Sequence, residues 1–338
     1  MKPGQLKRRR KSRGSGRVVA VTGVHGALAG RLLRRLDDDA RIGRLVLIDR
    51  SPVQAPLLKA ASYRVDLSEP NADGHMADIF RREDVNVLIH LAFHRRPHAD
   101  PAVAHELESV GTMHVIGALA RASGVESSLQ HLLVVSTALV YGAHPQSPAI
   151  VTESEQLRGC PGYPFIEEKV DAERQLEAAR ALLAIPITVL RPSLTLSPGD
   201  DGVEAAYFGG RVLPTVWGYD PLIQLVHAED VVDACRVALD RRPNGAYNIP
   251  GAAPLPLGTL IRLAGKFEFR LLACAAPVAA DVLWHLGLCA FPGDHVPYLR
   301  YPIVLDGERA AKDLGFRPRR STVETLEHFI GRRLPLAA

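Results

Sequence analysis

Apolar and polar positions alternate along the chain with two different periods from residue 17 onward. Short runs rich in Val, Ile and Leu are typical of strands buried on both faces, and longer segments with apolar residues every three or four positions are typical of helices. We expect strands over residues 17–22, 45–49, 63–67, 84–92, 132–136 and 187–191, and helices over 28–36, 73–82, 102–122 and 163–183. This alternation predicts an α/β fold with a doubly wound parallel sheet, the Rossmann fold, covered by helices on both faces.

The pattern changes after residue 191, where Pro and Gly become more frequent. We therefore expect an NAD(P)-binding Rossmann domain over residues 17–191 and a small C-terminal substrate-binding lobe over 192–335, with residues 225–250 returning to the core. A chain of 338 residues is long enough for both units. Residues 1–16 lie outside this pattern, and we expect them to form a basic, disordered tail.

The charge of the chain is distributed unevenly. The net charge is +4, but residues 1–17 carry eight basic and no acidic side chains, so the remainder has a net charge of −4. We interpret the basic segment as a solvated tail, and attachment to nucleic acid or to an anionic membrane surface is the less favoured alternative. No apolar segment of the signal-peptide type follows it. We expect a cytoplasmic protein without a nucleic-acid partner.

Two further features limit the function classes. The four cysteines form no C-x-x-C pair and have no His at ligand spacing, so we expect reduced core cysteines and no metal site. The most apolar segment, residues 271–292, is interrupted by Pro277, Asp281 and His285, which argues against a membrane span. We expect it to form a pair of helices that is buried or covers the substrate, and peripheral membrane contact is the less favoured alternative.

A glycine-rich turn joins the first predicted strand to the first predicted helix, where a Rossmann fold binds its dinucleotide. Gly23 permits a tight turn, Gly26 lets the backbone approach a pyrophosphate, and Ala29 takes the third small position of the motif. The helix that begins near Ala27 directs its N-terminal N–H groups at the phosphates. The predicted cofactor-binding residues of this turn are Gly23, His25, Gly26, Ala27 and Leu28.

An acidic residue closes the second predicted strand. Asp49 lies 26 residues after Gly23, where a carboxylate can accept hydrogen bonds from the adenosine ribose. This arrangement favours NAD, because a carboxylate repels the 2′-phosphate of NADP. The adjacent Arg50 leaves NADP open as an alternative cofactor, and a plain turn-forming role for Asp49 before Ser51 also stays open.

Short motifs then follow one another along most of the chain. They are TGVHGALA at 22–29, VDL at 65–67, IHLA at 89–92, VVSTALVYG at 134–142, LRPSLTLSPGD at 190–200, LVHAEDVVDA at 225–234, YNIPG at 247–251 and DLGFRP at 313–318. Each motif is weak alone, but the ordered set resembles the extended short-chain dehydrogenase/reductase superfamily, of the NAD-dependent epimerase/dehydratase type, over about residues 17–330.

The resemblance assigns further residues to the cofactor. It implies that Asp66 and Leu67 lie near the adenine and that Ser193 lies beside the nicotinamide. Leu91, Ala92 and Phe93 are expected along the dinucleotide. It also implies a homodimer through the helical segments 115–122 and 170–183.

The same resemblance implies a catalytic Tyr-x-x-x-Lys pair, in which the ammonium lowers the pKa of the phenol and holds the nicotinamide ribose. Lys169 fits the lysine position, and Thr137 fits that of a supporting hydroxyl. The residue four positions before Lys169 is Phe165, so the expected proton donor is missing.

Two replacements for the phenol are open. Tyr163 lies six residues before Lys169, about 240° around a helix, and Pro164 places it just before the helix begins. It is either a catalytic residue or a loop aromatic that packs over the site. Alternatively, a water molecule, Thr137 or a group of the substrate handles the proton.

Three other positions depart from the family pattern. Glu108 stands where an Asn is frequent, and Ala138 and Leu139 replace the acidic pair of dehydratases, which disfavours sugar dehydration. Ile223 replaces an Arg that is frequent in nucleotide-sugar enzymes and holds a phosphate.

Three functions follow from these observations. The leading hypothesis is an NAD(P)-dependent oxidoreductase or epimerase with non-standard acid–base chemistry, acting on a nucleotide sugar or a related alcohol or ketone. The second is an enzyme of the hydroxysteroid-dehydrogenase type acting on an apolar alcohol, which the apolar segment 271–292 and Ile223 favour. The third, which Phe165 favours, is a dinucleotide-binding regulator without turnover.

Overall fold

The computed structural model describes residues 16–53, 56–124 and 127–331. Within these ranges, seven parallel strands form one central sheet in the order β3-β2-β1-β4-β5-β6-β11. The strands are β1 (Arg17–Thr22), β2 (Ile42–Asp49), β3 (Ala60–Arg64), β4 (Val87–His90), β5 (His131–Val135), β6 (Ile187–Pro192) and β11 (Gly245–Ile249). The strand order reverses direction between β1 and β4, so the predicted doubly wound parallel sheet is confirmed. The predicted basic tail lies almost wholly outside the described residues.

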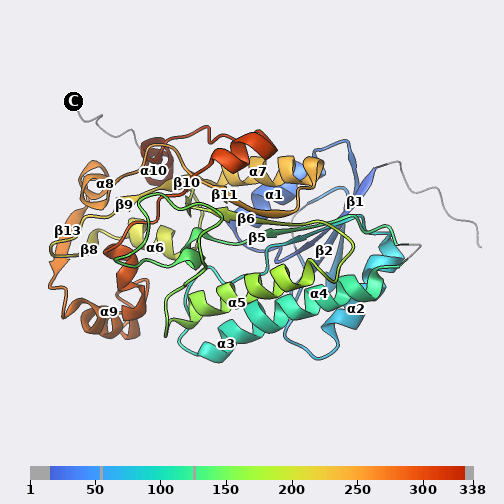
Figure 1. Ribbon diagram of the computed structural model, residues 1–338, viewed down its shortest axis with the longest axis horizontal. Coiled ribbons are helices and arrows are strands. Elements are labelled where there is room, and N and C mark those ends of the chain that lie inside the picture. The colour runs from blue at the N-terminus through green and yellow to red at the C-terminus, as the bar shows by residue number, and fades with distance from the viewer. Residues whose placement is uncertain (1–15, 54–55, 125–126, 332–338) are drawn as a thin grey trace, which may run out of the picture.

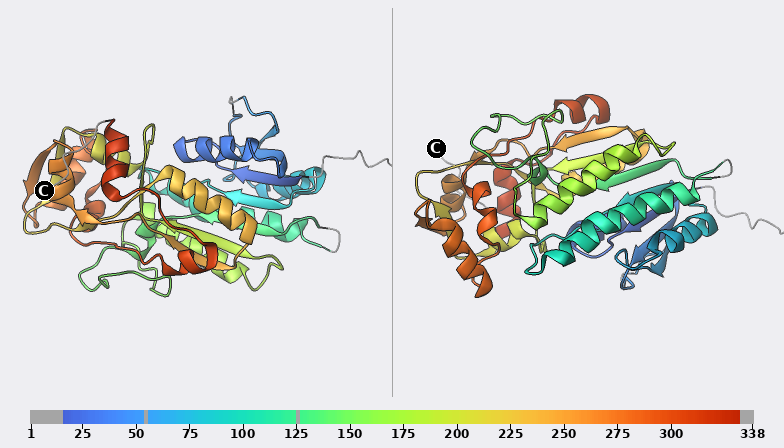
Figure 2. Two further views of the ribbon diagram at one scale, coloured as in Figure 1. Left: turned by 90° about the horizontal axis from the view of Figure 1, so that it is seen from above. Right: turned by 60° about the horizontal axis from the view of Figure 1, so that its bottom comes forward.

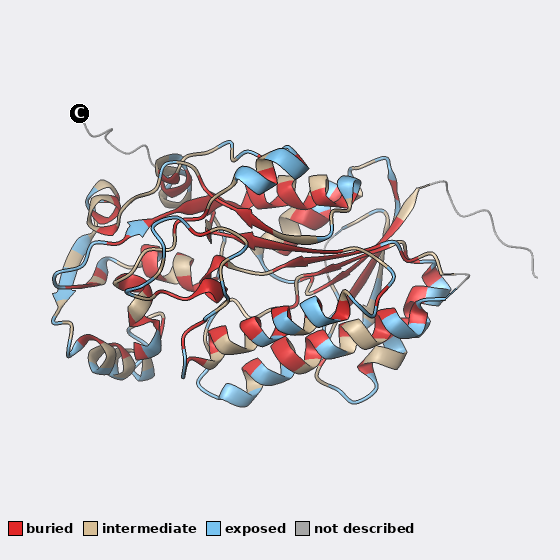
Figure 3. Ribbon diagram, in the orientation of Figure 1, coloured by how far each residue is buried: buried red, intermediate tan, exposed pale blue. Residues whose placement is uncertain are grey.

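Helices cover both faces of the sheet (Figure 1). One face carries α1 (Ala27–Asp37) and α7 (Ala228–Arg241), and the other carries α2 (Ala72–Glu83), α4 (Gly111–Ala122) and α5 (Pro164–Ala179). Residues in β1 alternate between the two faces, as the twofold period of a strand requires. Val19 and Val21 pack with the α1 side, whereas Ala20 packs under α2. The sheet is therefore buried from both sides (Figure 3).

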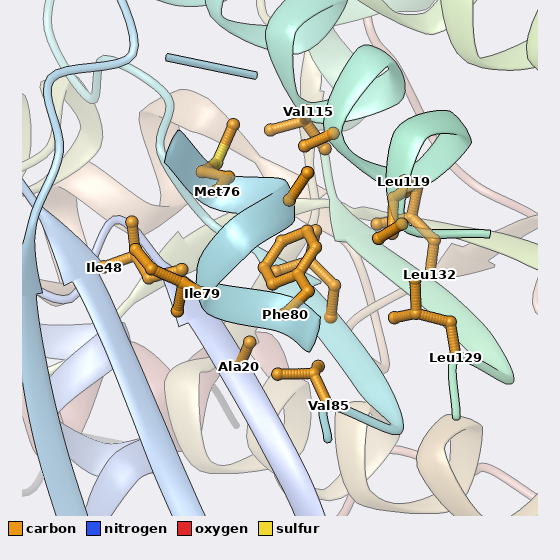
Figure 4. Close-up of a cluster of buried hydrophobic side chains, with 14 of the residues drawn as sticks. Ala20, Ile48, Met76, Ile79, Phe80, Val85, Val115, Leu119, Leu129 and Leu132 are labelled. Carbon is orange, nitrogen blue, oxygen red and sulfur yellow. The ribbon is translucent and has the colours of Figure 1, made fainter. Parts of the chain in front are cut away.

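The core on the α2 side of the sheet is formed by apolar side chains of α2, α4 and the strands. Met76, Ile79 and Phe80 of α2 point at the sheet and at α4, where Val115 and Leu119 meet them (Figure 4). Because Phe80 is 2% exposed, this ring is almost completely removed from water. The burial of such a ring is a main source of stability for this layer.

The chain after β6 forms the smaller lobe at one end of the molecule (Figure 2). Its core contains residues from α6 (Val203–Gly209), α8 (Leu257–Leu263) and α9 (Ala276–His285), with α10 (Thr322–Ile330) packed beside them. Its strands form three two-stranded sheets: β7 (Leu194–Leu196) with β10 (Leu225–His227), β9 (Leu222–Ile223) with β12 (Leu255–Pro256), and β8 (Val212–Val216) with β13 (Phe267–Leu271). Between these segments, β11 returns to the central sheet and pairs with β6.

The fourth strand is shorter than predicted, Val87–His90 instead of 84–92, and the helix α5 ends at Ala179 before the predicted 183. Two further elements differ in position or continuity. The third strand spans Ala60–Arg64 rather than 63–67, because the apolar residues Val65 and Leu67 are buried after the chain has left the sheet. The predicted helix 102–122 is divided into α3 (Pro101–His105), a π-helical turn η1 (Glu106–Val110) and α4. Apolar spacing does not distinguish a π-helical turn from a continuous helix.

The expectations for cysteine and for the apolar segment hold in part. All four cysteines are free, and Cys160 and Cys235 are buried, but Cys274 is exposed, so it is not a core residue. No group of His, Cys, Asp and Glu that could hold a metal ion occurs among the described residues. Residues 271–292 contribute one helix, α9, instead of a pair. In the part of the chain that the structure describes, no helix is long and apolar enough to span a membrane.

The packing of Phe80 predicts a large stability effect. Phe80→Ala should lower the free energy of unfolding by about 3–5 kcal/mol, because the ring leaves a cavity. Phe267, which is 75% exposed in β13, provides the matched control. Phe267→Ala should change stability by less than about 0.5 kcal/mol. Urea unfolding followed by circular dichroism measures both, and equal losses would contradict the assignment of Phe80 to the core.

Candidate functional site

A cleft of about 810 Å³ lies at the carboxyl ends of the central strands. This is the edge at which doubly wound sheets bind ligands, beside the reversal of strand order between β1 and β4. Segments that follow β1, β2, β4, β5 and β6 all contribute to its walls. Of the predicted site residues, the cleft is lined by Gly23, His25, Gly26, Leu28, Asp49, Arg50, Asp66, Leu67, Leu91, Ala92, Phe93, Thr137, Lys169 and Ser193.

Two glycines shape the turn between β1 and α1. Gly23 has φ of +73°, and a Cβ atom built there would lie 2.4 Å from the backbone nitrogen of Ala92, so the turn packs directly against the end of β4. Gly26 has φ of +98° and is the N-cap of α1, where no side chain accepts a hydrogen bond from the first turn. A helix N-terminus with uncapped N–H groups, reached by backbone alone, fits a pyrophosphate. Ala27 begins this helix but does not line the cleft.

The carboxylates of Asp49 and Asp66 lie at one end of the cleft. Asp49 Oδ2 accepts a hydrogen bond of 3.0 Å from the backbone N–H of Val24, which ties the end of β2 to the glycine turn. Asp66 Oδ1 accepts bonds from the backbone N–H and the hydroxyl of Ser68. Burial acts to raise the pKa of Asp66, but the bonds from Ser68 outweigh it and hold the pKa below its usual value. Both groups are therefore acceptors for ribose or adenine donors.

Lys169 lies at the opposite end, in a buried ion pair. Its Nζ donates to Glu108 Oε1 at 2.5 Å and to the carbonyl oxygen of His94 at 2.9 Å. Glu108 also accepts from the backbone N–H of His94 at 2.7 Å, and neither Glu108 nor Lys169 is more than 6% exposed. Burial lowers the pKa of Lys169 and raises that of Glu108, because water solvates neither charge. The sequence marked Glu108 only as a departure from the family pattern, and its pairing with Lys169 was missed.

Two aromatic rings flank the ammonium group of Lys169. Nζ lies 4.7 Å from the ring centroid of Phe165 and 5.4 Å from that of Phe93. Phe165 therefore occupies the space beside Lys169 that the family resemblance assigns to a phenol, and it offers a cation–π contact in place of a hydroxyl. Thr137 Oγ1 lines the cleft and accepts a 3.3 Å hydrogen bond from the backbone N–H of Leu139.

Tyr163 lies outside the cleft. Its side chain is 1% exposed, and its hydroxyl lies 3.3 Å from Nδ1 of His295. The ring packs against that of Phe165 at a centroid distance of 5.7 Å, and burial raises the pKa of Tyr163 far above its usual value. In this conformation Tyr163 supports Phe165 from behind and does not border the space where a cofactor or substrate can bind.

A narrow chamber of about 60 Å³ adjoins the cleft. Its walls come mainly from the smaller lobe and are mostly apolar, with contributions from Leu194, Tyr207, Phe208, Ile223, Phe291 and Leu299. Three residues border both the cleft and the chamber: Leu139, Ser193 and Glu204. Among the described residues that line the chamber there is no Lys or Arg.

The comparison with protein families identifies the class. A model of the NAD dependent epimerase/dehydratase family matches residues 19–250. The chain therefore belongs to this family, as its ordered motifs indicated. An uncharacterized protein of Mycobacterium tuberculosis is 28% identical over 333 residues, which cover 94% of this chain and 85% of that protein.

Solved structures with the same fold include two sugar-nucleotide enzymes. One is a UDP-glucose 4-epimerase from Thermotoga maritima with UDP-glucose: its TM-score is 0.70 at 18% identity, over 93% of this chain and 97% of that one. The other is a dTDP-glucose 4,6-dehydratase from Bacillus anthracis in complex with NAD. Its TM-score is 0.71 at 15% identity, over 94% of this chain and 96% of that one. At these identities the likeness establishes the fold.

The position of Asp49 predicts its effect on cofactor binding. Asp49→Ala should weaken NADH binding about 10-fold or more, because a hydrogen bond to a charged group contributes about 1.5–3 kcal/mol. Asp171, an exposed carboxylate on α5 paired with Arg174, provides the control, and Asp171→Ala should leave affinity unchanged. Titration of NADH fluorescence measures both. Equal affinity of the wild type and Asp49→Ala would exclude a ribose contact.

The ion pair predicts a second outcome. Glu108→Ala should destabilise the protein by about 3–5 kcal/mol, since it leaves the buried ammonium of Lys169 without its counter-ion. The double variant Glu108→Leu/Lys169→Met should be more stable than Glu108→Ala. Asp171→Ala, which breaks an exposed pair with Arg174 on α5, should cost less than about 1 kcal/mol. Urea midpoints compare the variants, and a Glu108→Ala effect as small as that of the control would contradict a structural role for the pair.

Proposed function

We propose that this protein is an NAD(P)-dependent oxidoreductase or epimerase, and that it acts on an alcohol or ketone held where the cleft meets the chamber. The main support is that the cleft and the chamber have three lining residues in common, Leu139, Ser193 and Glu204. The Lys169 end of the cleft therefore adjoins an apolar space in the smaller lobe. A substrate in the chamber would have its reacting carbon next to the place that the family pattern gives the nicotinamide.

The residues of the cleft fit a dinucleotide along its whole length. The glycine turn and the N-terminus of α1 would hold the pyrophosphate, Asp49 and Asp66 the adenosine, and Lys169 the nicotinamide ribose. Lys169 donates hydrogen bonds to Glu108 and to the carbonyl oxygen of His94, so the third of its N–H groups can donate to a ribose hydroxyl. The cofactor, when bound, supplies or accepts the hydride.

The choice between NAD and NADP rests on Asp49. Its carboxylate is fixed by the backbone N–H of Val24 and lines the cleft, where it would accept from a ribose hydroxyl and repel a 2′-phosphate. Arg50 also lines the cleft and is exposed. We propose NAD as the preferred cofactor.

The chamber favours an uncharged substrate with an apolar body. A nucleotide sugar carries a pyrophosphate, and the described residues that line the chamber include no Lys or Arg to hold it. Ile223, which stands where an Arg is frequent in nucleotide-sugar enzymes, is one of the lining residues. This supports the second of the sequence-based hypotheses over the first. With a volume of about 60 Å³, the chamber admits only a small ring or chain end unless the lobe opens.

A nucleotide sugar is the second candidate. It is supported by the Thermotoga epimerase, whose structure contains UDP-glucose, and by Arg95 and Arg96 in the cleft wall. Arg95 is already engaged by Asp200 at 3.3 Å and Asp201 at 3.5 Å, which reduces the positive charge left for a phosphate. The homodimer through α4 and α5, the cytoplasmic location and the direct catalytic role of Tyr163 stay predictions.

One panel of assays separates the three functions. Purified protein is incubated with NAD and secondary alcohols of increasing size, from cyclohexanol to a hydroxysteroid, and NADH formation is recorded. Incubation with UDP-glucose and UDP-glucuronic acid is followed by NMR for epimerisation. We expect NADH formation with an apolar alcohol and no conversion of either sugar nucleotide.

The other outcomes are equally clear. Conversion of a sugar nucleotide would establish the second candidate. NADH binding without turnover of any substrate, together with turnover that appears in Phe165→Tyr, would identify a dinucleotide-binding regulator and contradict the proposal.

A further inference from the structure

The missing phenol raises the question of which group exchanges a proton with the substrate. Several titratable side chains line the cleft, but His25, Asp49, Arg50 and Asp66 belong to its adenosine end. Lys169 is bound to Glu108 and His94, and its remaining N–H is assigned to the nicotinamide ribose. Among the described titratable residues of the cleft, Glu204 alone also borders the chamber.

The backbone places Glu204 over this junction. It is the second residue of α6, and the N–H of its neighbour Val203 donates to the carbonyl oxygen of Arg95 at 3.0 Å. This bond anchors the start of α6 to the segment that follows β4, which also carries His94 at the Lys169 end of the cleft. A carboxyl on the smaller lobe is thus held against the Rossmann domain.

Gly202 makes room for this arrangement. A Cβ atom built at Gly202 would lie 2.9 Å from Glu204 Oε2 and 3.1 Å from Arg95 Nη2. The carboxyl and the guanidinium therefore both lie in the space that a side chain at position 202 would need. Arg95 also forms ion pairs with Asp200 and Asp201. Its positive charge is therefore shared among several carboxylates and is not reserved for Glu204.

We propose that Glu204 is the catalytic acid and base of this enzyme, in place of the absent tyrosine. The inference rests on the proposed oxidoreductase function. In alcohol oxidation the O–H bond of the substrate breaks and its proton passes to the Glu204 carboxylate, while the hydrogen on the carbinol carbon leaves as hydride to NAD. The products are the ketone, NADH and protonated Glu204. In the reverse direction the carboxyl returns the proton to the oxygen of the forming alkoxide.

The surroundings of Glu204 suit a group that changes its protonation state. Burial raises the pKa of its carboxyl, and Asp200 acts in the same direction, whereas the N–H of its own backbone, Arg95 and Lys169 oppose them. Tyr163 also faces it, as a neutral group. A carboxyl whose pKa lies above the usual range holds and releases a proton closer to neutral pH, as general acid–base catalysis requires.

Three variants test the proposal with the best alcohol of the panel. Glu204→Gln keeps the shape but cannot carry the proton, so kcat should fall by about 10²–10⁴-fold, with NADH affinity within about twofold of the wild type. Phe165→Tyr restores a phenol beside Lys169, and the double variant Glu204→Gln/Phe165→Tyr should recover at least about tenfold of the lost turnover. The control is Glu69→Gln, an exposed carboxylate before α2, which should retain wild-type activity.

A second readout does not depend on turnover. The infrared carbonyl band of a protonated carboxyl, taken as wild type minus Glu204→Gln in the NAD-bound protein, reports the titration of Glu204 directly. Its midpoint should lie above that of an ordinary Glu, about 4.3. A midpoint at or below that value, or equal kcat for the wild type and Glu204→Gln, would overturn the assignment.

These outcomes separate the two proposals. If the wild type oxidises an alcohol and Glu204→Gln does so equally well, only the role of Glu204 fails. If no substrate is turned over by the wild type or by Phe165→Tyr, the oxidoreductase function fails, and the role of Glu204 within it fails too.

Discussion

The contact between Lys169 and Glu108 is the interaction on which the candidate site depends. The two residues come from α5 and from the π-helical turn η1, and both bind the backbone of His94 in the segment that follows β4. The segment after β4 and the turn η1 are thereby fixed to α5, more than sixty positions further along the chain, around one buried pair. Such a pair is costly to bury unless each charge finds additional partners. His94 supplies one for each charge, so the pair holds the deep end of the cleft in a single arrangement.

This arrangement explains how Phe165 is accommodated beside Lys169. Lys169 finds its hydrogen-bond acceptors in Glu108 and in the carbonyl oxygen of His94, and the ring of Phe165 contacts Nζ by its face. Behind that ring, Tyr163 and His295 close the layer. At the position where the family resemblance implies a proton-transferring phenol, Phe165 thus only packs against its neighbours. In our proposal the proton is transferred by Glu204 of α6, which lies where the cleft adjoins the chamber.

Much of the fold and of the cofactor cleft was predictable from the sequence because it depends on local signals. The strand and helix periods, the two glycines of the first turn and the acid that ends β2 each act within a few residues. The strand-end residues Leu91, Ala92 and Ser193 were placed by family resemblance, and they line the cleft as parallel strands must at their carboxyl ends. Ala27 and Tyr163 do not line it; Tyr163 is buried in the core beside Phe165.

What could not be predicted depends on contacts between distant segments. Glu108 and Lys169 are 61 positions apart, and no periodicity links them. The π-helical turn that carries Glu108 has the same apolar spacing as the helices around it. Glu204 lies in a Gly- and Asp-rich segment without a pattern, and its neighbour Val203 is held by Arg95, more than a hundred residues earlier. The chamber likewise exists only where two separately predicted units meet.

The central claim is that this cleft binds a dinucleotide with its reactive end at Lys169. Hydrogen exchange measured by mass spectrometry, with and without saturating NADH, tests it most directly. We predict slower exchange in peptides that cover residues 22–30, 48–53, 65–68, 91–95 and 135–139, with little change in α10. Slower exchange confined to other segments, or no change at saturation, would contradict it.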